Sequence, residues 1–318
     1  MTPSPNRLVI ASRGSRLALT QTSWVASALE AAHGGLRTEV LVVKTTGDVD
    51  QRPFAEIGGK GIFTSEVERS VAEGAADIAV HSAKDLTAVV SPECAIVAVP
   101  RREAPGDVVV GGAGDSGEER LATLPKGAVV GTSSIRRRSL LAEFRPDLEV
   151  VELRGNIDTR LRKVADGKVD AAILAAAGLD RLGAEVSCGP LSPDNWVPAP
   201  GQGALAIQAR SDRPDIAVLL EPLHDPESAA CLAAERSFAA RLEGSCNVPL
   251  GCLAQMRHGD LVLTGYLGLP DGGRSMRDRI SGPLADAEAM GRELAEAILA
   301  GGGDEIMEEL TWDSTEHA

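Results

Sequence analysis

The chain has 318 residues, of which 43% are hydrophobic and 25% charged, as is ordinary for a globular protein with a buried core. At roughly 150 residues per domain, this length predicts two or three domains. The net charge of −14 argues against nucleic acid as a partner, because neutralising phosphates needs a broad basic face.

The cysteines and the N-terminus indicate the cellular compartment. The five cysteines show neither CxxC nor Cys/His spacing, so no metal site is expected. The first residues, MTPSPNR, lack the apolar core of a secretory signal. No run reaches the roughly 18 apolar residues that span a bilayer. We therefore expect a cytoplasmic protein with reduced thiols and no membrane partner.

Short β-branched runs alternate with helical patterns over the first two thirds of the chain. The clearest helical pattern covers residues 17–32, where apolar side chains repeat on one face. Such alternation predicts βαβ units and mostly parallel sheets. The expected strands are 8–12, 38–46, 76–82, 95–100, 107–112, 127–133, 148–155 and 170–176.

Two segments rich in proline and glycine, 99–107 and 196–204, are candidate hinges, and they enclose about the length of one small domain. Beyond residue 222 the pattern changes. A helix over 226–243 precedes antiparallel strands within 250–269, and a helical pattern over 283–310 is broken by three glycines. This last part predicts a smaller α+β domain.

Arginine and hydroxyl side chains stand where several strands end and helices begin. Three junctions share this composition: RGSR (13–16), TSSIRRR (132–138) and RGNIDTR (154–160). Helix N-termini present N–H groups and a positive dipole end, and arginine matches carboxylates or phosphates. In an open α/β sheet these junctions gather at the carboxyl edge. The sequence therefore predicts a basic anion site within an acidic protein.

Rival nucleotide-binding motifs are weak. Residues 112–117 match GxGxxG after a strand, but Pro125 shortens the next helix and the acidic residue for a ribose is missing. The GGKG segment (58–61) lacks the spacing of a P-loop. Dinucleotide and nucleotide binding are therefore disfavoured.

Several segments, taken in chain order, resemble the porphobilinogen deaminase (hydroxymethylbilane synthase) family. They span about 240 residues, and the HSxKD, TSSxRR and LEGxCxVP motifs are the most specific. The matching segments are IASRGSRLALTQ (10–21), TTGD (45–48), GGKGIF (58–63), DIAVHSAKDL (77–86), GTSSIRRR (131–138), ELRGNIDTRL (152–161), ILAAAGLDRLG (173–183), PGQGALAI (200–207) and AERSFAARLEGSCNVPLG (234–251).

The resemblance implies an α/β fold class with three domains. Two doubly wound domains similar to type II periplasmic binding proteins are followed by a C-terminal α+β domain that carries a cofactor cysteine. We expect domain 1 over 1–104 and 200–222, domain 2 over 105–199 and domain 3 over 223–318.

The resemblance also implies a transferase of porphyrin (tetrapyrrole) biosynthesis. Members of the family join four porphobilinogen molecules head to tail into hydroxymethylbilane and release ammonia at each step. The chain grows on a covalent dipyrromethane cofactor made from the substrate itself, and a monomer is expected. Each pyrrole carries an acetate and a propionate, which gives the converging arginines a ligand rich in carboxylates.

Residue roles follow from the matching motifs. Asp85 is the expected catalytic residue, because a fixed carboxylate would stabilise the cationic pyrrole that remains when ammonia leaves. Cys246 would form a thioether to the first cofactor ring. The other expected cofactor-binding residues are Ser82, Lys84, Thr132, Ser133, Ser134, Arg136, Arg137 and Arg160. The expected substrate-binding residues are Arg13, Ser15, Gln21, Phe63, Arg154, Gly155 and Gln202.

Three positions depart from the family pattern. Glu56 stands where members often have lysine, and Ala83 and Thr87 replace a common methionine and proline. The alternative function is a non-enzymatic anion-binding module, because the same two-domain clamp serves both tasks. Asp85 and Cys246 favour the enzyme.

Overall fold

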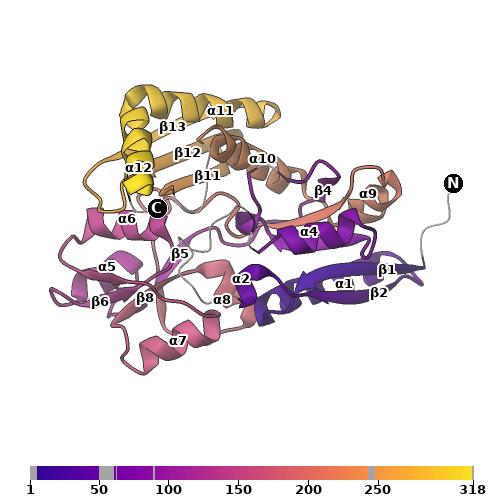
Figure 1. The fold of residues 1–318 in the computed structure, drawn as a ribbon, viewed down its shortest axis with the longest axis horizontal. Coiled ribbons are helices and arrows are strands. Elements are labelled where there is room, and N and C mark those ends of the chain that lie inside the picture. The colour runs from indigo at the N-terminus through magenta and orange to yellow at the C-terminus, as the bar shows by residue number, and fades with distance from the viewer. Residues whose placement is uncertain (1–5, 50–60, 62, 89, 243–247, 317–318) are drawn as a thin grey trace. The chain divides into compact units, whose positions relative to one another are not determined.

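The computed structural model describes residues 6–49, 61, 63–88, 90–242 and 248–316 (Figure 1). The chain divides into two compact units, and each is built from two stretches of sequence. The first unit comprises Met1–Glu103 and Gly203–Leu232, and the second comprises Ala104–Gln202 and Ala233–Ala318. The boundary at residue 232 falls within helix α10 (Pro226–Arg241).

The first unit contains a five-stranded sheet in the order β2-β1-β3-β10-β4. β1 pairs in parallel with β2 and β3, whereas β10 is antiparallel to both of its neighbours. The sheet is mixed rather than mostly parallel because the strand that returns from the second unit runs in the opposite direction. Its strands are β1 (Arg7–Arg13), β2 (Arg37–Val43), β3 (Ile78–Ser82), β4 (Cys94–Ala98) and β10 (Leu205–Arg210).

Apolar alternation places different helices on the two faces of this sheet. Ile78 and Val80 of β3 share a core with Val25 of α1, whereas Ala79 shares another core with Val67 of α4. The Ser15 hydroxyl starts α1 by accepting a hydrogen bond from the Ala18 amide at 3.3 Å. Besides α10, the helices are α1 (Arg16–Ala32), α2 (Thr46–Val49), α4 (Ser65–Ala72), the 3₁₀ turn η1 (Ala83–Asp85), α9 (Pro214–Leu220) and η2 (Glu221–Leu223).

The second unit repeats the same sheet pattern in the order β7-β6-β8-β5-β9. β6 is parallel to β7 and β8, and β5 is antiparallel to β8 and β9. The strands are β5 (Asp107–Gly111), β6 (Val129–Gly131), β7 (Glu149–Val151), β8 (Ala171–Ala175) and β9 (Cys188–Pro190). The helices are α5 (Gly117–Thr123), α6 (Ile135–Phe144), α7 (Ile157–Ala165) and α8 (Ala176–Leu182).

A three-stranded antiparallel sheet, β11-β12-β13, also belongs to the second unit. The glycine-rich break predicted near residue 301 is present, since Gly302 has φ +114°. The elements are β11 (Leu250–Arg257), β12 (Asp260–Gly268), β13 (Ser275–Gly282), η3 (Leu284–Asp286), α11 (Ala287–Ile298), the π-turn η4 (Leu299–Gly303) and α12 (Asp304–Glu316). The two mixed sheets and this α+β part confirm the predicted fold class.

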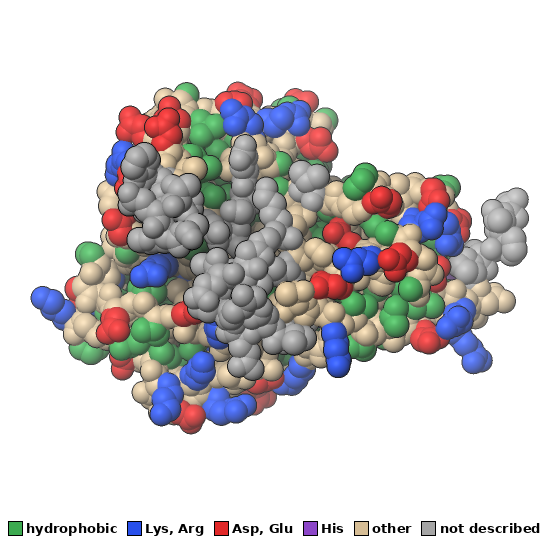
Figure 2. All heavy atoms as spheres, in the orientation of Figure 1, with side chains coloured by type: hydrophobic (Ala, Val, Ile, Leu, Met, Phe, Trp, Pro, Cys, Tyr) green, Lys and Arg blue, Asp and Glu red, His purple; other side chains and the backbone are tan. Residues whose placement is uncertain are grey.

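Acidic and basic side chains are interspersed on the face drawn in Figure 2. Exposed ion pairs illustrate the mixture, such as Arg241 with Glu296 and Arg274 with Glu305. Among the described residues, no helix is both long and apolar enough to cross a membrane.

Candidate active site

Asp85 lies in the short turn η1 that directly follows β3. Its carboxylate is 34% exposed, and its Oδ2 lies 3.7 Å from Nη1 of Arg13 at the end of β1. Because β1 and β3 are parallel neighbours, their carboxyl ends meet at one edge of the sheet. The topology therefore brings together two predicted site residues that are 72 positions apart, and it leaves the carboxylate partly accessible.

Phe63 also contacts Arg13. The guanidinium carbon of Arg13 lies 4.2 Å from the centre of the Phe63 ring, which is a cation–π contact. A Cβ atom on Gly47 would overlap this ring, so the glycine of the TTGD segment gives Phe63 the room it needs. Arg13 thus contacts both an aromatic ring and the Asp85 carboxylate.

Gln21 and Ser82 form a polar pair beside the turn. Gln21 Nε2 donates to Ser82 Oγ at 3.0 Å, and that hydroxyl lies 3.2 Å from Gln21 Oε1. Gln21 is only 4% exposed on α1. Lys84, next to Asp85, is exposed, and the Ser15 hydroxyl is engaged as the cap of α1. The predicted residues of the first unit therefore share one sheet edge, with Gln21 and Ser82 supporting the turn.

In the second unit, three hydroxyl residues connect β6 to α6. Ser133 Oγ donates to the Leu153 carbonyl at 2.6 Å, and Thr132 Oγ1 accepts from the Ser134 amide at 3.1 Å. Ser134 caps α6 by accepting from the Arg137 amide. These bonds fix the start of a helix, where backbone N–H groups favour an anion.

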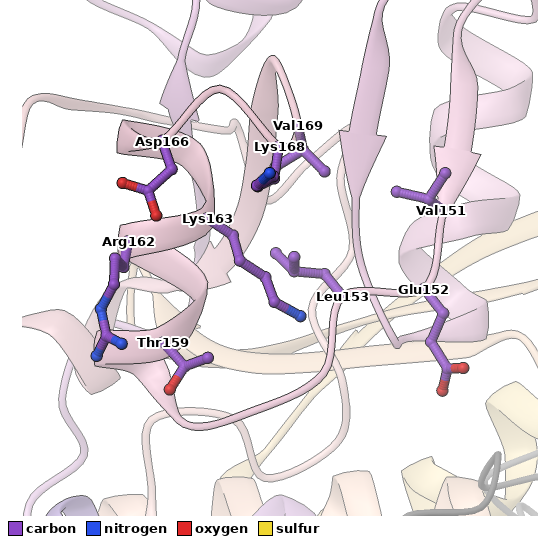
Figure 3. A pocket seen from close by; sticks show the side chains of 9 residues that line it. All are labelled: Val151, Glu152, Leu153, Thr159, Arg162, Lys163, Asp166, Lys168 and Val169. Carbon is purple, nitrogen blue, oxygen red and sulfur yellow. The ribbon is translucent and has the colours of Figure 1, made fainter.

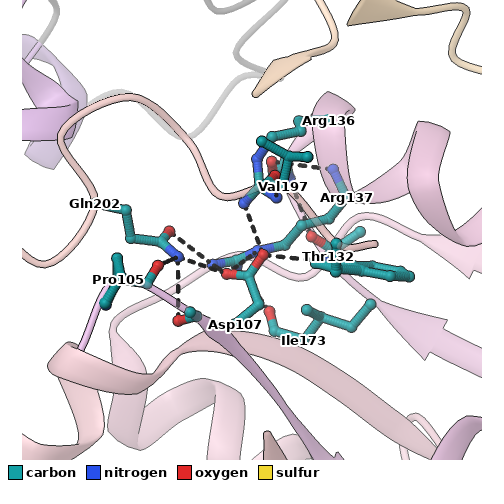
Figure 4. A network of polar contacts seen from close by, with 11 residues as sticks. Pro105, Asp107, Thr132, Arg136, Arg137, Ile173, Val197 and Gln202 are labelled. Carbon is teal, nitrogen blue, oxygen red and sulfur yellow. Dashed lines mark hydrogen bonds and ion pairs between the residues drawn. The ribbon is translucent and has the colours of Figure 1, made fainter. Parts of the chain in front are cut away.

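Arg136 and Arg137 follow this cap and point into a buried network around Asp107 (Figure 4). Asp107 Oδ2 accepts from Arg136 Nη2 at 2.8 Å, and Oδ1 accepts from Arg137 Nη2 at 2.7 Å. Arg137 Nε also donates to Asp107 Oδ1 at 3.1 Å, and its Nη2 lies 3.4 Å from Gln202 Oε1. The Nη1 atoms of Arg136 and Arg137 donate to the carbonyls of Val197 and Ile173, respectively. Arg136 Nε is buried without a partner among the described residues. Both arginines are thus tied to a carboxylate that the sequence analysis did not single out.

Gln202 and Trp196 complete this network. Gln202 Nε2 donates to Asp107 Oδ1 at 2.8 Å and to the Pro105 carbonyl at 2.7 Å, while Trp196 Nε1 donates to Asp107 Oδ2 at 3.1 Å. Burial alone would raise the pKa of the Asp107 carboxyl, but the positive charges of Arg136 and Arg137 and the hydrogen bonds from Arg137 and Gln202 hold it well below its usual range. Gln202 joins the two segments at which the chain enters and leaves the second unit.

The third junction lies between β7 and α7. Arg154 Nε donates to Glu152 Oε1 at 2.7 Å, and Arg160 Nε donates to the Gly155 carbonyl at 2.8 Å. Gly155 has φ +110°, and a Cβ atom there would overlap Thr159, so the turn requires glycine. The local bonds hold the two arginines at the start of α7.

A hollow lies between α7 and the residues at the end of β7 (Figure 3). Lys163 extends into it, and its Nζ donates to the Arg154 carbonyl at 3.3 Å. Val151, Leu153 and Val169 form the apolar part of its lining. None of the predicted site residues lines this hollow.

Some predicted features lie outside the described residues, namely Cys246, Glu56 and the GGK segment (58–60). Sequence reasoning missed the buried polar residues Asp107, His81 and Gln208. A signal existed for Asp107, since it is the charged first residue of the otherwise apolar strand DVVVG.

These observations define an α/β protein whose two mixed sheets each present arginine and hydroxyl groups at a strand-to-helix edge. Two family models match the sequence. The first, "Porphobilinogen deaminase, dipyromethane cofactor binding domain", covers residues 8–218. The second, "Porphobilinogen deaminase, C-terminal domain", covers residues 229–300.

Curated relatives match over nearly the whole chain. A porphobilinogen deaminase of Roseiflexus castenholzii is 45% identical over 95% of this chain and 99% of its own. One of Methylobacillus flagellatus is 44% identical over 96% of this chain and 98% of its own.

Solved structures with some likeness include two binding proteins. The methionine-binding protein MetQ has a TM-score of 0.42 and 12% identity, over 69% of this chain and 89% of its own. The aliphatic sulphonate binding protein SsuA from Escherichia coli has a TM-score of 0.40 and 14% identity, over 77% of this chain and 73% of its own.

The chain belongs to the porphobilinogen deaminase family. The predicted family, transferase class and dipyrromethane cofactor are confirmed by this membership.

Proposed function

We propose that this chain joins four porphobilinogen molecules head to tail into hydroxymethylbilane, with release of ammonia, and that Asp85 is the catalytic residue. The observation that carries the proposal is the Arg13–Asp85 pair. The pair stands at the carboxyl edge of a mixed sheet, and Asp85 is held by one long ion pair and is 34% exposed.

The residues present fit a dipyrromethane cofactor. When bound, this group supplies a pyrrole carbon to which the incoming substrate is joined. Its ring N–H groups need an acceptor and its carboxylates need cations. Asp85 offers the acceptor, and Lys84 and Arg13 offer positive charge. In the second unit, two guanidinium groups and one carboxylate leave the Asp107 network with one excess positive charge. Arg136 Nε has no partner within the part of the chain that the structure describes.

The protein's own groups divide the work. Asp85 accepts a hydrogen bond from a pyrrole N–H and stabilises the positive charge that develops as ammonia leaves. Arg13, Ser15, Phe63, Arg154 and the Gly155 backbone position the substrate, and Gln21 and Gln202 support them. Ser82, Lys84, Thr132, Ser133, Ser134, Arg136, Arg137 and Arg160 orient the carboxylates of the cofactor, and Cys246 anchors it as a thioether.

Replacing Asp85 by asparagine tests the proposal. The amide keeps the size of the side chain but removes the negative charge, so porphobilinogen consumption should fall by about 100-fold or more. Intact mass spectrometry should still show the two-ring adduct. A suitable control is Asp212→Asn, which changes an exposed aspartate of the same unit that is also paired with an arginine. Ordinary turnover in Asp85→Asn would refute the assignment.

A second measurement tests the anchor. Cys246→Ala should give a protein whose mass equals that of the bare polypeptide. An adduct of two pyrrole rings on this variant would place the attachment elsewhere.

The setting of the enzyme is part of the proposal. We infer a cytoplasmic monomer with three domains, divided at residues 104/105, 199/200 and 222/223. Light scattering during gel filtration tests the oligomeric state, since a mass near twice the 33.0 kDa of the chain would contradict a monomer.

A further inference from the structure

The last two residues of β3, His81 and Ser82, stand directly before the turn that carries Asp85. Successive residues of a strand point to opposite faces of the sheet. Ser82 therefore faces α1, where Gln21 holds it. His81 faces the side of α4, where Ala79 and Val67 form an apolar core, and it is only 5% exposed. A histidine buried beside such a core needs a polar partner.

Gln208 and Glu68 provide a polar path on that face. Gln208, on β10, is fully buried, and its Nε2 donates to Oε1 of Glu68 on α4 at 2.7 Å. Glu68 is 8% exposed. The path therefore links β10 to α4 through side chains that are almost inaccessible to water.

Two buried atoms of this path lack a well-aligned hydrogen bond among the described residues, namely His81 Nε2 and Gln208 Oε1. They are complementary, because an imidazole N–H can donate to an amide oxygen. The strand register places them on one face, since Gln208 pairs with Ala79 and Ala206 pairs with His81. An Nε2–H tautomer of His81 that donates to Gln208 Oε1 satisfies both atoms.

Electrostatics favours the neutral imidazole. The pKa of His81 is lowered to about 4, chiefly by burial; the Gln208 amide opposes this shift, and the positive charge of Arg13 contributes to it. A protonated His81 would add a second cation near Arg13. The neutral form leaves Arg13 as the near cation of Asp85.

We propose that His81, oriented through Gln208 and Glu68, is a positioning residue that fixes the end of β3 and thereby the Asp85 carboxylate against Arg13. The inference rests on the proposed catalytic role of Asp85. Ser82 and His81 then anchor the same turn from opposite faces of the sheet. A small shift of a catalytic group slows a reaction strongly, and a displacement of about 1 Å can cost on the order of 100-fold.

Steady-state kinetics of the cofactor-loaded His81→Leu and His81→Gln enzymes test this inference. Leucine keeps most of the volume but cannot hydrogen-bond, so kcat should fall by about 10- to 100-fold with KM within twofold of wild type. Glutamine retains an N–H that reaches Gln208, so it should restore most of the kcat. Adduct mass checks that each variant carries the cofactor, and thermal unfolding checks that it is folded. A purely structural role would give neither the loss of kcat at constant KM nor the rescue by glutamine.

Three results would overturn the inference: wild-type kcat in His81→Leu, a loss confined to KM, or no rescue by glutamine. If His81→Leu does not fold, Gln208→Met gives the same readout, and wild-type kcat in that variant would equally contradict the inference. Asp85→Asn is assayed beside them. An inactive Asp85→Asn with a fully active His81→Leu would defeat this inference alone, whereas an active Asp85→Asn would defeat the proposed function.

Discussion

Asp85 and Asp107 both lie beside arginines in mixed sheets of the same strand pattern, yet their surroundings differ. The Asp107 side chain is fully buried and accepts five hydrogen bonds from four side chains. Asp85 is 34% exposed and has Arg13 Nη1 at 3.7 Å. The residue type is the same, but the number of partners and the access to solvent are not.

This difference separates a structural carboxylate from one that can act on a ligand. A buried charge is tolerated only when its hydrogen-bonding capacity is filled, and Asp107 meets that condition. Its pKa is held far below the usual range, so it stays ionised. A carboxylate that must stabilise a passing charge needs room for the ligand, and Asp85 retains that room.

The largest effect on stability is expected from Asp107→Asn. Removing the charge leaves two buried guanidinium groups without their counterion, which should cost about 3–5 kcal/mol of unfolding free energy. Urea denaturation of the wild type, this variant and Asp85→Asn measures the contrast, and Asp85→Asn should change the free energy by less than about 0.5 kcal/mol. Equal losses in the two variants would remove the distinction.

His81 should make stability depend on pH. Its pKa of about 4 in the folded state lies below the value of about 6.5 in an unfolded chain, so the unfolded state binds more protons between these values. The contribution of neutral His81 to the unfolding free energy should be fully present above about pH 6.5. It should be lost as the pH falls toward 4, which lowers the unfolding free energy by at most about 3 kcal/mol. The charged neighbours, Arg13 and the Glu68 carboxylate bonded to Gln208, are unchanged in His81→Gln. The difference in pH dependence between wild type and His81→Gln therefore measures the contribution of the His81 imidazole. An unchanged slope in His81→Gln would contradict the prediction.

Trp196→Phe probes a single bond to Asp107. Phenylalanine keeps an aromatic ring but loses the indole N–H that donates to Oδ2. Because the acceptor is charged and buried, the loss should be about 1.5–3 kcal/mol. Val197→Ala, at a fully buried neighbour outside the hydrogen-bonded side chains, is the matched test of packing alone. A stability close to wild type in Trp196→Phe would show that the other four bonds saturate the carboxylate.

The smallest loss of stability is expected at a partly exposed ion pair. Arg277 contacts both carboxylate oxygens of Glu143 and lies 4.7 Å from the centre of the Tyr266 ring, with its side chain 32% exposed. Arg277→Gln should cost about 1 kcal/mol or less. Added salt should weaken the wild type toward the variant, because exposed charges are screened. A loss as large as that of Asp107→Asn would mean that burial does not govern these pairs.

Local sequence patterns predict most of the secondary structure and the family. Periodicity located α1 and most of the strands, because β-branched runs and one-sided apolar helices carry their own signal. Motifs identified the family and proposed Asp85. The strands β9, β10 and β13 were not predicted. β9 has only three residues and β13 is largely exposed, so neither shows a clear apolar alternation. β10 is buried along almost its whole length, so it shows no alternation either.

The pairing of the charged groups, in contrast, depends on the tertiary fold. Arg136 and Arg137, like Arg13, stand where a strand ends and a helix begins. Their guanidinium groups nevertheless turn into the core toward Asp107, some 30 positions earlier in the chain. His81 and Gln208 lie 127 positions apart and come together because β10 returns beside β3. Local patterns encode helices and strands, whereas burial and pairing depend on contacts between distant segments, and those contacts determine which carboxylate is locked and which stays accessible.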